Sequence, residues 1–151
     1  THLEYYSAPP RMAQAMALRG LHAQACGRAL APPRPEEGGA SSPFQAKVHT
    51  EQTILCGDFN MPAADPAYAQ LVAPFEPVAG VQRRLLDAWT VAHGDAPHAP
   101  TFRLFDRRYG PDPVACDFVF LSDNLAPRLR RIDVDTNTQV SDHQPVVIEL
   151  A

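Results

Sequence analysis

Three short runs each place a carboxylate beside an apolar, strand-like segment. They are residues 57–60 (Gly-Asp-Phe-Asn), 116–118 (Cys-Asp-Phe) and 141–143 (Ser-Asp-His). An acid at the edge of a buried strand is costly unless it is paired, hydrogen-bonded or bound to a metal ion. Three such positions in one small domain predict a cluster of carboxylates with a histidine. Such a cluster suits a hard cation and a phosphate ester.

Asp58 and Asn60 flank Phe59 directly after an apolar segment. If the chain stays extended there, both polar side chains point to one side and Phe59 points to the other. That arrangement suits a carboxylate that orients or deprotonates water and an amide that binds a phosphoryl oxygen. A tight turn is the alternative interpretation, because Gly, Asp and Asn are favoured turn residues.

Asp117 lies in a run that is otherwise apolar from residue 114 to residue 121, so it needs a partner. It could fix the tautomer of a histidine and stabilise its cationic form; a structural ion pair with an arginine is the alternative. Asp142 and His143 would point to opposite sides of an extended segment, but in a bend both could face one pocket. A solvated turn is the alternative there. His2 lies in a strand-like segment, where a structural role is the alternative.

Hydrophobic periodicity indicates the elements that must position these residues. After Ser7, apolar residues recur at steps of three or four, which predicts an amphipathic helix over about 10–30 with an apolar face of Met12, Ala15, Leu18, Leu21 and Ala25. Asp65-Pro66 predicts the start of a helix that ends near residue 72. A third helix is predicted over 81–92, and a turn or short helix over 124–129. The predicted loops are 31–46 and 93–113, and the predicted strands are 1–6, 50–56, 101–105, 114–121, 131–138 and 145–150. Interleaved helices and strands with short late connections predict one α/β domain.

Composition narrows the class of protein. The chain has 151 residues, 45% of them hydrophobic and 20% charged, with a formal net charge of −4. This balance argues against a strongly basic nucleic-acid surface. No apolar run approaches the roughly 20 residues of a membrane span. The three cysteines form no CxxC motif and are expected to be reduced thiols, so the cytoplasm is the expected location.

Missing motifs narrow the chemistry further. The sequence contains no GxSxG, no HExxH, no Cys/His zinc spacing and no Gly-rich phosphate loop. His22, His49, His93 and His98 have no supporting pattern and are expected to be surface or loop residues. Carboxylates with amide and water ligands suit Mg²⁺ or Mn²⁺ better than Zn²⁺.

The order of these runs resembles the endonuclease/exonuclease/phosphatase superfamily, which includes DNase-like nucleases, neutral sphingomyelinases and inositol-polyphosphate phosphatases. The resemblance rests on Thr-His-Leu at 1–3, Gly-Asp-Phe-Asn at 57–60, Asp-Phe-Val-Phe at 117–120 and Ser-Asp-His-Gln-Pro-Val at 141–146. It implies a four-layer α/β sandwich with two mainly antiparallel sheets. It also implies Mg²⁺- or Mn²⁺-dependent attack of water on a phosphate ester, which could be a small molecule, a lipid or a nucleic acid.

The resemblance also implies a role for each matched residue. Asp58 resembles the residue that aligns or activates the water, and Asn60 resembles a ligand of the phosphate and the metal. Asp117 resembles the partner of His143, and His143 resembles the histidine that contacts the scissile phosphate. Two further residues match the pattern: Asp142 as a metal carboxylate, and His2 as the residue that binds or protonates the phosphate.

The early asparagine and the metal-binding glutamate of the family have no counterpart in this chain. Residues 1–151 are therefore expected to be the C-terminal part of a single catalytic domain, to pair with a missing N-terminal half and to be catalytically poor alone. A non-catalytic binding module and a half-domain that assembles, for instance as a homodimer, are the alternatives. Arg103, Arg107 and Arg108 could grip a second phosphate, although a solvated loop is the alternative interpretation.

Overall fold

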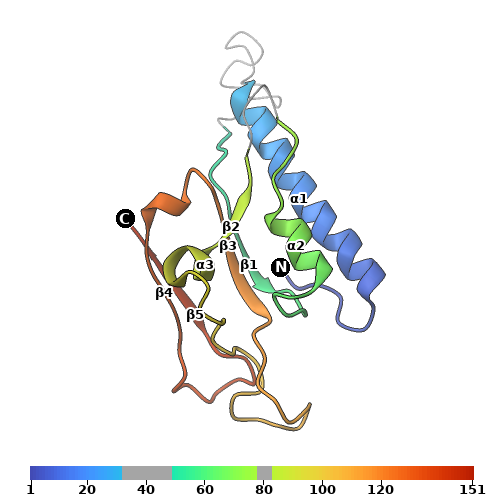
Figure 1. Cartoon of the computed structure of the whole chain (residues 1–151), viewed down its shortest axis with the longest axis vertical. Helices are drawn as coiled ribbons and strands as arrows, with labels where there is room; N and C mark the ends of the chain where they lie inside the picture. The colour runs from blue at the N-terminus through green and yellow to red at the C-terminus, as the bar shows by residue number, and fades with distance from the viewer. Residues whose placement is uncertain (32–48, 78–82) are drawn as a thin grey trace, which may run out of the picture.

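A mixed α/β structure is formed by the residues that the computed structural model describes, namely 1–31, 49–77 and 83–151. Over these ranges the chain has three α-helices and two small antiparallel sheets (Figure 1). The predicted α/β class is confirmed at this level. The three-stranded sheet has the order β1-β3-β2, and the two-stranded sheet pairs β4 with β5. The strands are β1 Ile54–Asp58, β2 Leu85–Asp87, β3 Asp117–Ser122, β4 Leu129–Val134 and β5 Val146–Leu150.

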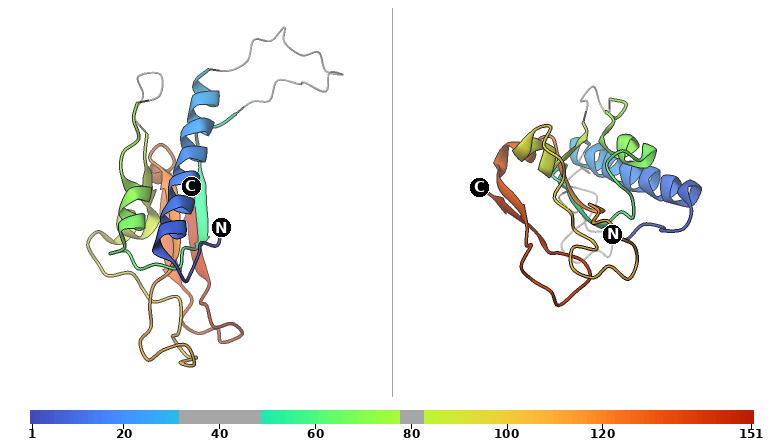
Figure 2. Two further views of the ribbon diagram at one scale, coloured as in Figure 1. Left: turned by 90° about the vertical axis from the view of Figure 1, so that its right-hand side faces the viewer. Right: turned by 60° about the horizontal axis from the view of Figure 1, so that its bottom comes forward.

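One face of the three-stranded sheet is covered by two helices, α1 (Ala8–Leu30) and α2 (Pro66–Val72) (Figure 2). Alternate residues of β3 point to this side, and the buried rings of Phe118 and Phe120 join the helices in one core. Phe59, which is fully buried, packs edge-on against Phe120 with ring centroids 5.0 Å apart. Burial of these aromatic rings fixes β1 and β3 against the helices.

The opposite face of this sheet packs against α3 (Ala88–His93) and the β4–β5 pair. The intervening residues of β3, Val119 and Leu121, share this second core with Ile132 of β4. Figure 2 separates the layers when the molecule is turned: the helices α1 and α2 lie on one side of β1-β3-β2 and the β4–β5 pair lies on the other. Both faces of β3 are therefore buried, which accounts for its nearly continuous apolar sequence.

Side-chain caps define two of the helix starts. Asp65 accepts a hydrogen bond from the backbone N–H of Ala67 at 2.8 Å, and Asp87 accepts one from Trp89 at 2.7 Å. The helix predicted from Asp65-Pro66 is thus confirmed. Ser7 occupies the N-cap position of α1 but its side chain makes no capping hydrogen bond. A short 3₁₀ helix, η2 (Ala126–Arg128), falls inside the turn or helix predicted over 124–129.

Towards the C-terminal end of α1, the residues that are buried differ from those predicted. Ala15 is fully buried as expected, but Leu21 is 60% exposed. His22 and Cys26, at steps of seven and eleven from Ala15, are buried instead. These steps keep one face of a 3.6-residue helix against the sheet, whereas Leu21 lies off that face.

Two predicted elements are wrong in kind. Residues 85–87 of the helix predicted over 81–92 form β2, because Leu85 and Leu86 pair with Ser122 and Leu121 of β3. Only the part from Ala88 onwards is helical; residues 81 and 82 lie outside the described residues. The strand predicted over 1–6 is reduced to a single parallel bridge between His2 and Asp58, because the chain bends at residues 5 and 6 to enter α1.

Other boundaries differ by a few residues. The strand predicted over 50–56 runs from Ile54 to Asp58, so the acid lies in β1 and not after it. The strand predicted over 131–138 ends at Val134, because the Asp135 carboxylate accepts from the backbone N–H groups of residues 137 and 138. The strand predicted over 101–105 contains only bridges at Phe102. Residues 32–46 of the predicted loop lie outside the described residues.

Cys26, Cys56 and Cys116 are all free thiols, as expected, although Cys56 is exposed and the other two are buried. Among the helices of the described ranges, none combines the length and apolar character needed to cross a bilayer.

Candidate active site

Two of the predicted carboxylates lie opposite each other across neighbouring strands. In the antiparallel pairing of β1 with β3, Asp58 is the register partner of Asp117. Directly opposed residues of antiparallel strands project to the same side of the sheet. Both side chains are largely buried, with exposed fractions of 17% and 18%. Two adjacent acids in this setting require hydrogen-bond donors or cations as partners.

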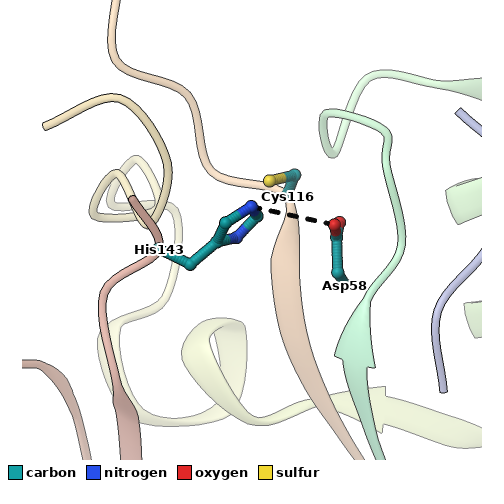
Figure 3. A group of neighbouring side chains, drawn as sticks. All are labelled: Asp58, Cys116 and His143. Carbon is teal, nitrogen blue, oxygen red and sulfur yellow. Dashed lines mark ion pairs between the residues drawn. The ribbon is translucent and has the colours of Figure 1, made fainter. Parts of the chain in front are cut away.

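His143 supplies a partner for both acids. Its Nδ1 lies 2.8 Å from Asp117 Oδ2. Its Nε2 lies 3.9 Å from Asp58 Oδ2, the ion pair drawn in Figure 3. Because a carboxylate accepts at Nδ1, the proton of the neutral ring is held on Nδ1 and the Nε2 lone pair faces Asp58. The ring is also stacked on Phe102, with centroids 4.5 Å apart and planes inclined by 24°. The predicted pairing of His143 with Asp117 is therefore present.

His2 approaches Asp58 from the other side. Its Nε2 lies 3.5 Å from Asp58 Oδ2, while 75% of the imidazole is exposed. Gly57 allows this approach: its φ is +145°, and a Cβ at this position would lie 1.9 Å from the backbone oxygen of Thr1. The N–H of Leu3 then donates to the Asp58 carbonyl at 2.9 Å. Asp58 thus lies between an exposed and a half-buried imidazole.

Asn60 joins the site mainly by shaping the backbone. Its backbone N–H donates to Asp58 Oδ1 at 2.8 Å, and its side-chain Nδ2 donates to the Leu3 carbonyl at 2.8 Å. It has a φ of +51°, a conformation that asparagine tolerates better than most residues. The turn interpretation of this run is therefore confirmed: β1 ends at Asp58, and the backbone N–H of Asn60 in the turn after it holds the carboxylate.

Thr101 was not identified from the sequence and is 1% exposed. Its hydroxyl donates to Asp117 Oδ2 at 2.6 Å and accepts from the backbone N–H groups of Asp117 at 3.1 Å and Cys116 at 3.2 Å. These contacts fix the carboxylate that orients His143. A threonine in a Pro-rich loop carries no local signal for this role, because its partner is 16 residues away in the sequence.

The sequence predicted for Cys116 only that it is a reduced thiol. Its Sγ lies in one group with donor atoms of Asp58 and His143, all within 4.8 Å of one another (Figure 3). Burial raises the pKa of the Cys116 thiol, and the nearby carboxylates raise it further. The protonated thiol is positioned to donate to Asp117 Oδ2 at 3.5 Å.

Asp58, Cys116 and His143 do not by themselves form a Mg²⁺ site. Mg²⁺ prefers oxygen ligands in octahedral geometry. In the donor group, Asp58 offers the one carboxylate, and its companions are an imidazole and a thiol. The carboxylate of Asp117 is already engaged by His143 and Thr101.

Asp142, the third predicted metal ligand, is not in this donor group. Its backbone carbonyl accepts from the N–H of Arg103, and its side chain lines a surface hollow together with Asp106 and Arg108. The bend at residues 141–143 therefore sends His143 to the cluster while Asp142 lines a different hollow.

The three arginines of the 103–108 loop bind within their own loop. Arg103 donates to the Tyr109 carbonyl at 2.9 Å, and Arg107 donates to the Pro111 carbonyl. Arg108 donates from Nε and Nη2 to Asp106 Oδ2, at 2.8 and 2.5 Å. Only Arg103 reaches the site region, where it lines an apolar hollow of ≈ 110 Å³ beside Asn60 and Cys116.

A second histidine–aspartate pair was also missed. His98 Nε2 lies 2.6 Å from Asp87 Oδ2, which also accepts the Tyr68 hydroxyl at 2.6 Å. Asp87 is buried and caps α3, and burial together with this carboxylate raises the pKa of Tyr68. His98 lies in a loop, as expected, but these contacts leave only 17% of its side chain exposed. His22 is neither a surface nor a loop residue, so the expectation for it is wrong: it lies in α1 and is buried, with Nδ1 2.8 Å from Thr53 Oγ1.

Comparison of the chain with protein-family models, with curated proteins and with solved structures found no match.

Proposed function

We propose that this chain is part of a metal-dependent phosphoesterase that hydrolyses a phosphate ester with activated water. One observation carries the proposal: Asp117 holds His143 by Nδ1, so that Nε2 faces Asp58 at 3.9 Å. A histidine oriented by one carboxylate beside a second carboxylate is an arrangement suited to proton transfer. The same residues carry the resemblance to the endonuclease/exonuclease/phosphatase superfamily.

The proposed roles follow from these contacts. Asp58 accepts the proton of a water molecule whose oxygen forms the new bond to phosphorus, while the bond from phosphorus to the ester oxygen breaks. When protonated on both ring nitrogens, a form that Asp117 stabilises, His143 donates from Nε2 to a phosphoryl oxygen and offsets its charge. His2 is exposed beside Asp58 and donates a proton to the leaving oxygen. Asn60 holds Asp58 in place through its backbone N–H.

The proposal includes Mg²⁺ or Mn²⁺, although the described residues do not complete a site for either ion. When bound, such an ion would polarise a phosphoryl oxygen. Asp58 is the carboxylate ligand that the donor group offers such an ion, and the remaining oxygen ligands would come from the substrate and from water. The catalytic roles of Asp58, His143 and His2 do not depend on how the ion would be coordinated.

We also propose that the chain belongs to a four-layer α/β sandwich of the DNase-like type. The order of helices, three-stranded sheet and two-stranded sheet supports this, since these layers would correspond to three of the four. Residues 1–151 would then be the C-terminal part of one such domain. The net charge of −4 and the local contacts of the three loop arginines favour a small or lipid phosphate ester over duplex DNA.

Hydrolysis assays test the proposal directly. The chain is incubated at high concentration with bis(p-nitrophenyl) phosphate and with p-nitrophenyl phosphate, with Mg²⁺, Mn²⁺ or a chelator. We expect slow, metal-stimulated release of nitrophenol, and an Asp58→Asn variant should lose on the order of 10²-fold of it. Asp95→Asn, at an exposed position, is the matched control.

Binding of inorganic phosphate gives a second readout that does not require turnover. Imidazole NMR signals of His143 and His2 should shift on phosphate addition in the wild-type chain. Absence of both hydrolysis and phosphate-induced shifts would overturn the proposed function. Rapid hydrolysis by the 151 residues alone would instead refute the expectation that this chain lacks part of its metal site.

An assembly module is the second candidate, and the exposed side of β1 favours it. Ile54 and Cys56 share a face with Val119 and Leu121 of β3, since these residues are register partners. The β3 residues are buried by the second core, but Ile54 is 48% exposed and Cys56 is also exposed. This uncovered apolar strip could pair with a missing half-domain or a second copy. Solution mass by light scattering tests it: a monomer at all concentrations would exclude self-assembly.

A further inference from the structure

The donor atoms of Asp58, Cys116 and His143 converge from three separate segments of the fold. They come from the end of β1, from the residue before β3 and from the bend before β5. Figure 3 shows the thiol, the imidazole and the carboxylate turned towards one another. All three ligand atoms lie within 4.8 Å of one another. Small side-chain adjustments would bring such a triad to the bond lengths of a tetrahedral transition-metal site.

The imidazole is already oriented as a metal ligand. Metal-binding histidines almost always donate the N–H of the other ring nitrogen to a carboxylate or carbonyl, which fixes the tautomer. His143 makes this contact through Nδ1 to Asp117 at 2.8 Å, and the Thr101 hydroxyl holds the same carboxylate oxygen at 2.6 Å. The Nε2 lone pair is thereby directed towards Asp58, on the side where the triad converges. Stacking on Phe102 further restricts the ring.

The chemistry of the triad selects the kind of cation. A thiol sulfur is a soft ligand that Mg²⁺ and Ca²⁺ avoid, whereas sulfur, imidazole and carboxylate together are typical of Zn²⁺. Cys116 is 5% exposed, so the sulfur is shielded from solvent oxidants. It nevertheless lies within 4.8 Å of the donor atoms of Asp58 and His143. Three protein ligands leave the fourth position of a tetrahedral ion open to water or to an anion.

We propose that Asp58, Cys116 and His143 bind one Zn²⁺ ion. On binding, the sulfur–hydrogen bond of Cys116 breaks, its proton passes to solvent and a zinc–sulfur bond forms, with no change of oxidation state. Binding requires no hydrolytic activity, so it stands apart from the proposed function. If that function is also correct, Zn²⁺ withdraws Asp58 and His143 from catalysis and is an inhibitor.

Calorimetric titration of the metal-free 151-residue chain with Zn²⁺ tests the site, with Co²⁺ absorption as a direct probe of sulfur ligation. The wild type should bind one equivalent, and the Co²⁺ form should show thiolate-to-cobalt charge transfer in the near ultraviolet. Cys116→Ser and Cys116→Ala should each weaken Zn²⁺ binding by more than about 100-fold, because even an outer-sphere partner is worth about 10–100-fold. Both should abolish the charge-transfer band.

Cys56→Ser is the matched control, because this thiol is exposed and outside the triad, and it should leave binding unchanged. Fluorescence of Trp89 and circular dichroism check that each variant is folded. An unchanged affinity in both Cys116 variants, or no saturable Zn²⁺ binding by the folded wild type, would overturn the site. Hydrolysis is not measured, so this result is independent of the phosphoesterase test.

Discussion

Replacing Thr101 by valine removes one buried hydroxyl and nearly preserves side-chain volume. That hydroxyl donates to Asp117 Oδ2, accepts from the backbone N–H groups of Asp117 and Cys116, and lies 3.9 Å from Cys116 Sγ. Thr101 is 1% exposed, so water cannot replace these contacts without opening the site. We therefore expect Thr101→Val to destabilise the fold and to loosen the orientation of His143.

The contacts of Thr101 allow the loss of stability in Thr101→Val to be estimated. A hydrogen bond to a charged group contributes about 1.5–3 kcal/mol, and a buried donor left without an acceptor costs about 1–3 kcal/mol. Asp117 keeps His143 as a partner, so the terms do not add in full. We expect a loss of about 3 kcal/mol from the free energy of unfolding, a large share of the roughly 5–15 kcal/mol typical of a domain.

Urea unfolding followed by the fluorescence of Trp89, the single tryptophan, measures this loss. Thr101→Ser is the matched control: it keeps the hydroxyl and removes one methyl group, which should cost about 1 kcal/mol. In an Asp117→Asn background the valine substitution should cost less, because the acceptor has lost its charge. A valine variant as stable as the serine variant would refute the reasoning.

Two further substitutions test the entry to the site and the buried face of α1. Gly57→Ala should lower the free energy of unfolding by about 1–3 kcal/mol because of the positive φ of Gly57. The added Cβ should also displace the N-terminal segment, so hydrogen exchange of the Leu3 amide should accelerate. Gly20→Ala, where an added Cβ meets no neighbouring atom, is the control and should leave this exchange unchanged, whereas unchanged exchange in Gly57→Ala would contradict the prediction. Burial lowers the pKa of His22, so below about pH 6.5 the unfolded chain binds a proton that the native state does not, and stability is lost as the pH falls. Between about pH 7 and pH 5, the urea midpoint should fall less steeply with pH in His22→Gln than in the wild type. His49→Gln, at an exposed position, is the control and should show the wild-type dependence on pH. The same dependence of the urea midpoint on pH in all three proteins would contradict this prediction.

Long-range pairing accounts for most differences between the predicted and the observed elements. The helix at 65–72 was predictable because its cap and its proline are local signals. The strand at 85–87 was not predictable, because a short apolar run is compatible with a helix and with a strand. Pairing with β3, which is distant in the sequence, decides for the strand. The strand predicted for the N-terminal segment was wrong for the complementary reason, since its backbone pairs with β1 no further than Leu3.

The sequence by itself determined that Asp58, Asp117 and His143 need partners, because a charged or polar group beside buried strands cannot remain unsatisfied. Only the tertiary structure decided which partners they have. Strand register sets Asp58 opposite Asp117, and the bend before β5 directs His143 to both. The same geometry adds Thr101 and Cys116 and excludes Asp142 from the donor group, since these positions depend on contacts between residues that no local pattern connects.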